Sequence, residues 1–137
     1  MDLKLDESKI PEEVLAILIF GSCVENERLA RDIDICIVAP KAENKASLLL
    51  KMLSMLSTPK TDIWLFEELP LYMKAEVIQK HKILWCKNIK ELYLYFAETM
   101  KLWRDQKTRR DKFLKQLLKS QKDTKERSFK SLFISEL

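Results

Sequence analysis

The chain has 137 residues, of which 47% are apolar and 34% are charged, which suits a single hydrophobic core with an extensive polar surface. Its longest apolar run, residues 14–20, is too short to span a bilayer, and acidic Asp2, Asp6 and Glu7 do not fit a basic secretory signal. Three widely spaced cysteines and one histidine match neither a disulfide framework nor a zinc site, which favours a reduced, cytoplasmic protein.

The net charge of +4 is unevenly distributed along the chain. Residues 101–137 carry 12 Lys/Arg and 5 Asp/Glu, a net charge of +7, whereas residues 1–100 carry −3. A basic segment of this kind can bind nucleic acid or an acidic partner, although a solvated helix face is the commoner case. Since no Gly-Arg or aromatic residues are interleaved with the basic ones, nucleic acid is the less favoured partner.

The first predicted element is a buried strand over residues 14–20, a continuous apolar run between Pro11 and Gly21. Gly21 is the only glycine of the chain, so we expect it at a position where no side chain fits. Ser22 is expected to cap a short helix over residues 24–30. A glycine that lets a phosphate approach the backbone, a helix N-terminus and the Ser22 hydroxyl together form a candidate phosphate-binding turn.

A second strand is predicted over residues 32–38, where polar and apolar residues alternate at the start. Asp32 and Asp34 then lie on one face, roughly 6.5 Å apart along the strand. Two carboxylates on a mostly apolar strand repel each other and lose hydration, a penalty that a divalent cation removes. Magnesium prefers carboxylate, phosphate and water oxygens, so this pair is a candidate magnesium site.

Residues 44–56 have the apolar spacing of a helix. Residues 61–66 form a third predicted strand, with Asp62 at its second position. Neighbouring strands lie roughly 4.8 Å apart, so Asp62 can add a third carboxylate to the site. Three carboxylates on two adjacent strands can bridge two metal ions. Such two-metal sites stabilise the attacking and leaving oxygens of a displacement at phosphorus.

A helix over residues 71–80, a strand over 83–86 and a helix from Lys90 complete the predicted order. The alternation predicts an α/β fold, a small mixed sheet of about four strands flanked by helices, with a C-terminal helical extension. Trp64, Trp85 and Trp103 are expected in the core or at an interface, and His81 is given no role.

We expect a domain over residues 1–119 and a basic tail over residues 120–137. Residues 119–127 contain almost nothing apolar and are interpreted as a polar spacer before a short amphipathic helix. The tail can fold back on its own domain or dock on a partner, and its basic charge favours the partner. The apolar residues of the tail, spaced along one helix face, are Phe129, Leu132, Phe133 and Leu137.

The order of these motifs resembles the minimal nucleotidyltransferase family of the polymerase-beta-like superfamily, which includes the MntA-type antitoxins of HEPN/MNT pairs. The resemblance covers roughly residues 10–120. The motifs that carry it are Ile19-Phe20-Gly21-Ser22, then nine residues, then Asp32-Ile33-Asp34-Ile35-Cys36-Ile37-Val38, followed by Thr61-Asp62-Ile63-Trp64 and Ile83-Leu84-Trp85.

The resemblance implies that Gly21 and Ser22 hold the triphosphate of ATP, and that Asp32, Asp34 and Asp62 bind two Mg²⁺ ions and are the catalytic carboxylates. The loop after Ser22 is one residue shorter than usual and carries Glu25-Asn26-Glu27-Arg28, which leaves the nucleotide preference open.

The acceptor follows from the resemblance as well. It implies transfer of AMP to a tyrosine of a partner HEPN toxin, the activity of an antitoxin. One alternative is a small-molecule acceptor, although related enzymes of that kind usually need an additional substrate domain. Another is a non-catalytic nucleotide-binding module that neutralises a toxin by contact. Homo- and hetero-oligomers both remain open.

Overall fold

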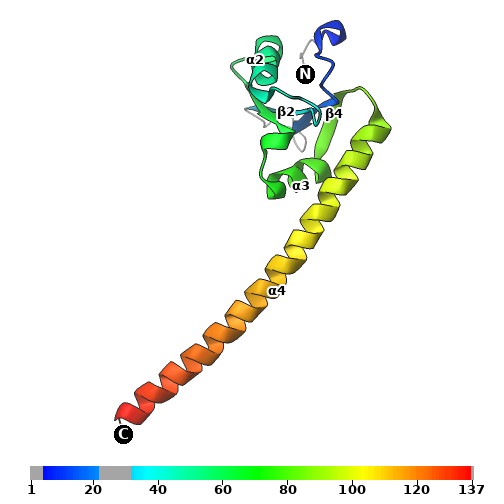
Figure 1. The fold of residues 1–137 in the computed structure, drawn as a ribbon. Helices are drawn as coiled ribbons and strands as arrows, with labels where there is room; N and C mark the ends of the chain where they lie inside the picture. The colour runs from blue at the N-terminus through cyan, green and yellow to red at the C-terminus, as the bar shows by residue number, and fades with distance from the viewer. Residues whose placement is uncertain (1–4, 22–31, 137) are drawn as a thin grey trace. The chain divides into compact units, whose positions relative to one another are not determined.

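The computed structural model describes residues 5–21 and 32–136, with side chains up to residue 121. The chain divides into two compact units, Met1–Met100 and Lys101–Leu137. Figure 1 shows the elements in chain order. They are η1 (Glu7–Lys9), β1 (Ala16–Phe20), β2 (Ile33–Val38), α2 (Lys45–Leu56), β3 (Thr61–Leu65), η2 (Phe66–Glu68), α3 (Leu71–Gln79), β4 (His81–Cys86) and α4 (Ile89–Glu136).

The first unit is built on a four-stranded sheet with the order β3-β2-β1-β4. Strand β1 is antiparallel to both β2 and β4, whereas β3 runs parallel to β2, so the sheet is mixed. This confirms the predicted α/β class and strand number. Strands β3 and β4 form the two edges of the sheet.

Apolar side chains cover both faces of the sheet because the strand residues alternate between two core clusters. One cluster joins Leu18 and Cys36 to α3 and the first turns of α4, through residues such as Leu92 and Phe96. The other joins the intervening strand residues to α2. Its fully buried members include Ile17, Ile35, Ile37, Leu48 and Met52.

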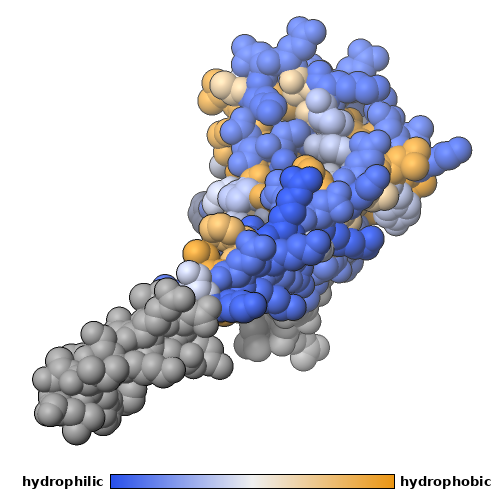
Figure 2. Space-filling view, turned by 60° about the horizontal axis from the view of Figure 1, so that its bottom comes forward, coloured by the Kyte–Doolittle hydropathy of each residue, from blue (hydrophilic) through white to orange (hydrophobic). Residues whose placement is uncertain are grey.

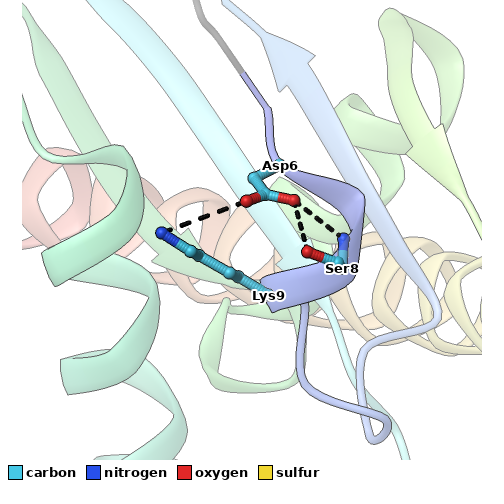
Figure 3. A network of polar contacts seen from close by, with 3 residues as sticks. All are labelled: Asp6, Ser8 and Lys9. Atoms are coloured by element: carbon cyan, nitrogen blue, oxygen red, sulfur yellow. Dashed lines mark hydrogen bonds and ion pairs between the residues drawn. The ribbon is translucent and has the colours of Figure 1, made fainter.

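Local signals place the ends of several elements. Helix α2 begins after Asn44, whose side-chain oxygen accepts a hydrogen bond from the Ser47 amide at 3.0 Å. Asp6 caps η1 in the same way, with the Ser8 amide at 3.1 Å, and also lies 3.9 Å from the Lys9 ammonium (Figure 3). Strand β4 begins at His81, two residues before the predicted start, because His81 pairs with Phe20 of β1.

Helix α4 differs most from its prediction. It is a single helix of 48 residues, and residues 119–127, interpreted from the sequence as a spacer, are helical. The spacer interpretation is wrong because it weighs only burial: Lys, Gln, Glu and Arg are good helix formers even where they bury nothing. The predicted short helix over residues 24–30 lies outside the described residues.

The surface seen in Figure 2 is mainly hydrophilic, with separate hydrophobic areas. Within the part of the chain that the structure describes, no helix is long and apolar enough to cross a membrane. The exposed large apolar residues of α4 after Met100 are Leu102, Phe113, Leu114, Leu117 and Leu118.

Candidate active site

The candidate site lies where three strand ends meet. The last residue of β1, Phe20, is paired with Asp34 of β2, and Gly21 follows directly. On the other side of β2, the parallel register places Asp62 of β3 opposite Asp34. Asp32 immediately precedes β2. The sheet therefore brings the predicted glycine and the predicted carboxylates to the same end of three adjacent strands.

Gly21 has a φ of 83°, in the region that side chains rarely adopt. A Cβ atom built on it would lie 2.6 Å from Oδ2 of Asp34. This confirms the expectation that the only glycine of the chain occupies a position where no side chain fits. The missing side chain leaves room for the Asp34 carboxylate, a reason that the sequence did not reveal. Ser22 lies outside the described residues.

The Asp34 carboxylate is half-buried, whereas those of Asp32 and Asp62 are exposed. Burial is the largest cause that raises the pKa of Asp34, and the negative charges of Asp62 and Asp32 raise it further. A hydrogen bond from the Trp64 indole to Asp34 acts in the opposite direction. The negative charges of Asp32 and Asp62 therefore repel that of Asp34. A divalent cation bound between the carboxylates would offset this repulsion.

The donor set is chemically suited to magnesium, because it consists of carboxylates alone. Asp34 and Asp62 are in register on neighbouring strands. Among the described residues, however, no three His, Cys, Asp or Glu side chains stand close enough to form a metal cluster as they are. The backbone therefore places Asp34 and Asp62 side by side, without bringing the three carboxylates together into a metal cluster.

Trp64 is a neighbour of the site that the sequence reading did not identify. It was expected in the core or at an interface, yet its side chain is 42% exposed. Its Nε1–H donates to Oδ1 of Asp34 at 3.5 Å. The i, i+2 spacing from Asp62 on the same strand is the sequence signal that could have found it, since such residues share a face.

Glu67 was also missed. One carboxylate oxygen accepts from the Ala39 amide and the other from the Tyr95 hydroxyl, both at 2.9 Å. Burial and the neighbouring Glu67 raise the pKa of Tyr95. Glu67 therefore connects the end of β2 to α4 within the first unit and has a structural role.

His81, to which the sequence assigned no role, is half-buried, and its Nδ1 lies 2.9 Å from the Ile78 carbonyl oxygen.

The chain resembles known proteins in sequence and in fold. The family model described as polymerase beta, nucleotidyltransferase matches residues 6–90. A protein of Methanocaldococcus jannaschii named "putative protein adenylyltransferase" is 40% identical over 98 residues, which cover 71% of this chain and 75% of the relative.

Solved structures show the same fold. One is a toxin–antitoxin complex with AMP-PNP, with a TM-score of 0.60, 20% identity, and coverage of 81% of this chain and 90% of the other. Another is the tri-AMPylated Shewanella oneidensis HEPN toxin in complex with an MNT antitoxin, with a TM-score of 0.58, 18% identity, and coverage of 81% and 88%. The family match and the 40% identical relative show that the chain belongs to the polymerase beta nucleotidyltransferase family and is a nucleotidyltransferase.

Proposed function

We propose that the chain is a metal-dependent, cytoplasmic protein adenylyltransferase that transfers AMP from ATP to a tyrosine of a HEPN-type toxin and so acts as its antitoxin. The observation that carries the proposal is the arrangement of Gly21 against Asp34, with Asp62 in register beside it. The identity with the Methanocaldococcus jannaschii protein supports AMP transfer to a protein. The solved toxin–antitoxin complexes support a HEPN-type partner.

Each residue of the site then has a chemical task. Gly21 and Ser22 hold the phosphates of ATP, because a backbone without a side chain and a hydroxyl can both approach phosphate oxygens. Asp32, Asp34 and Asp62 hold Mg²⁺, two ions in our proposal. When bound, the metal offsets the negative charge that develops on the phosphate oxygens. The acceptor hydroxyl oxygen bonds to the α-phosphorus and loses its proton to water, while the bond to the bridging oxygen breaks and pyrophosphate leaves.

We further propose that the part of α4 after Met100 contacts the protein acceptor. This helix carries four apolar side chains that are 43–64% exposed: Phe113, Leu114, Leu117 and Leu118. Burial of such side chains away from water is energetically favourable. Residues 101–121 carry eight Lys/Arg and two Asp/Glu. Two copies of so basic a helix would repel each other, so an acidic surface on a different protein is the complementary occupant. We still propose the domain boundary after residue 119, so these four apolar residues belong to the domain over residues 1–119.

The test is label transfer from ATP radiolabelled at the α-phosphate to a co-expressed HEPN-type partner. Wild-type chain with Mg²⁺ should label the partner, and a chelator should abolish the label. Asp34→Asn should abolish transfer, because it removes a metal ligand. It should barely harm the fold, since it relieves carboxylate repulsion. Glu43→Gln, at an exposed carboxylate between β2 and α2, is the matched control and should label normally.

Three results would contradict the proposal, each in a different way. Full transfer by Asp34→Asn would exclude the carboxylate mechanism. Label on a small molecule but never on the partner would indicate the small-molecule alternative. Neutralisation of the toxin by Asp34→Asn without any label would indicate inhibition by contact.

A further inference from the structure

Trp64 occupies an unusual position for a tryptophan. It lies on the edge strand β3, two residues after Asp62, so the two side chains share a face of the strand. Its side chain is 42% exposed, and neither core cluster of the described residues includes it. Trp85, by contrast, packs against the core cluster on the α2 side of the sheet. The folding of the sheet therefore does not account for an indole at position 64.

The Trp64 indole instead faces one oxygen of Asp34. Its Nε1–H lies 3.5 Å from Oδ1, a long contact at an exposed site. The other oxygen, Oδ2, lies in the space left by the missing side chain of Gly21. Asp34 is on β2, between β1 and β3, so the two ends of its carboxylate meet a neighbour from each adjacent strand.

We infer that Trp64 is a positioning residue that sets the orientation of the Asp34 carboxylate, and hence its readiness to bind the metal ion. The inference rests on the proposed metal-dependent transfer. A carboxylate that turns freely must be ordered when an ion binds, whereas one held by a donor is already oriented.

Two substitutions separate the donor from the ring. Trp64→Phe keeps an aromatic ring and removes the N–H, while Trp64→Gln keeps an N–H donor and removes the ring. Trp85→Phe, on the opposite edge strand β4, is the tryptophan control. Mn²⁺ binding to the purified full chain, followed by electron paramagnetic resonance, gives a readout independent of catalysis. Transfer kinetics to the partner and thermal unfolding are measured in parallel.

We expect Trp64→Phe to weaken Mn²⁺ binding by about tenfold, the lower end of what loss of a ligand's hydrogen-bond partner costs. It should lower kcat and leave KM for ATP within about twofold, because the phosphate-binding turn is untouched. Trp64→Gln should recover part of the Mn²⁺ affinity. The control should match wild type in both measurements, and no variant should melt far from wild type.

Unchanged Mn²⁺ binding in Trp64→Phe would overturn the inference, as would Trp64→Gln binding no better than Trp64→Phe. Either result leaves the proposed function standing if Asp34→Asn loses Mn²⁺. A wild-type chain that binds no Mn²⁺, or an Asp34→Asn variant that binds it normally, would overturn the metal-dependent function and the inference together.

Discussion

Helix α4 buries one set of apolar side chains in the first unit and exposes another in the second. In the first unit, Leu92 of α4 is fully buried with residues of the sheet and α3. In the second, Leu117 of the same helix is 43% exposed and Phe113 is 60% exposed. Helical periodicity is present in both segments, so periodicity alone does not bury a side chain. Burial needs an opposing layer, which the sheet provides in the first unit.

The comparison also separates two roles. The family match, residues 6–90, falls within the first unit and contains Gly21, Asp34 and Asp62. The exposed large apolar residues of α4 after Met100 lie beyond it. In our proposal the first unit performs the chemistry, and the second unit contacts the acceptor protein.

The largest expected effect comes from truncating the same side chain in both units. Leu92→Ala should lower the free energy of unfolding by about 2–5 kcal/mol, because it leaves a cavity in a packed core. Leu117→Ala should change it by less than about 0.5 kcal/mol, as substitutions on exposed surfaces do. Urea unfolding of both full-length variants measures the difference. Equal losses would mean that Leu117 is buried in the free protein and would break the comparison.

Gly21→Val tests the turn at the candidate site. A branched side chain at a φ of 83° is strained, and its Cβ would displace the Asp34 carboxylate. We expect transfer to fall by about a hundredfold, the cost of misplacing a reacting group by roughly an ångström. ATP affinity should fall as well, whereas partner binding through α4 should persist. ATP binding that matches wild type would show that the triphosphate does not lie at this turn.

The double substitution Leu114→Ser/Leu117→Ser tests the second unit. Both leucines are about half exposed in the free chain, so burial against the partner would remove about half of each side chain from water. Full burial of a leucine contributes roughly 1.5–3 kcal/mol, so affinity should drop by about tenfold or more. Metal and ATP binding should not change. Leu50→Ser, an exposed leucine of α2 in the first unit, is the control and should bind the partner normally. Partner affinity unaffected by the double substitution would remove α4 from the interface.

Tyr95→Phe probes how the first unit is held together. It removes the hydrogen bond to Glu67 and should cost about 1 kcal/mol of unfolding free energy at neutral pH. Burial and Glu67 raise the pKa of Tyr95 in the folded state, so the unfolded chain loses this proton first. Wild-type stability should therefore decline as the pH rises above about 10, the ordinary tyrosine pKa. The decline should be shallower in Tyr95→Phe, and parallel curves would show that Tyr95 is not responsible.

Deletion of residues 120–137 should have the smallest effect on the fold and on the nucleotide site, while it weakens partner binding. This segment belongs to the second unit and lies outside the family match. We expect the melting temperature and ATP binding to stay close to those of the full chain. A deletion that unfolds the domain would place the tail in the core and overturn the proposed boundary after residue 119.

The sequence predicted the elements of the first unit well, since their signals are local. The apolar run before Gly21, the alternation after Asp32 and the helical spacing over residues 44–56 each depend on neighbouring residues. The strand order was not predictable in this way. Strand β4 follows β3 in the chain but pairs with β1, and no periodicity encodes that choice.

The candidate site was predictable in its residue types, and less so in its contacts. Asp32, Asp34 and Asp62 follow from strand patterns, but the register of Asp34 with Asp62 is a property of the folded sheet. The contacts of Trp64 with Asp34 and of Glu67 with Tyr95 join residues 30 and 28 positions apart. Such pairings depend on tertiary structure. Only the Trp64–Asp34 contact has a local sequence signal, because Trp64 shares a strand face with Asp62.

The edge position of β3 has a consequence for amide hydrogen exchange. Strand β3 pairs with β2 alone, so half of its backbone amides face away from the sheet and lack a ladder partner. Edges of this kind open locally at a lower free energy than central strands do. An ion held by Asp34 and Asp62 together would join β3 to its neighbour, so the protection that metal confers should be concentrated in β3 and be least at the opposite edge, β4.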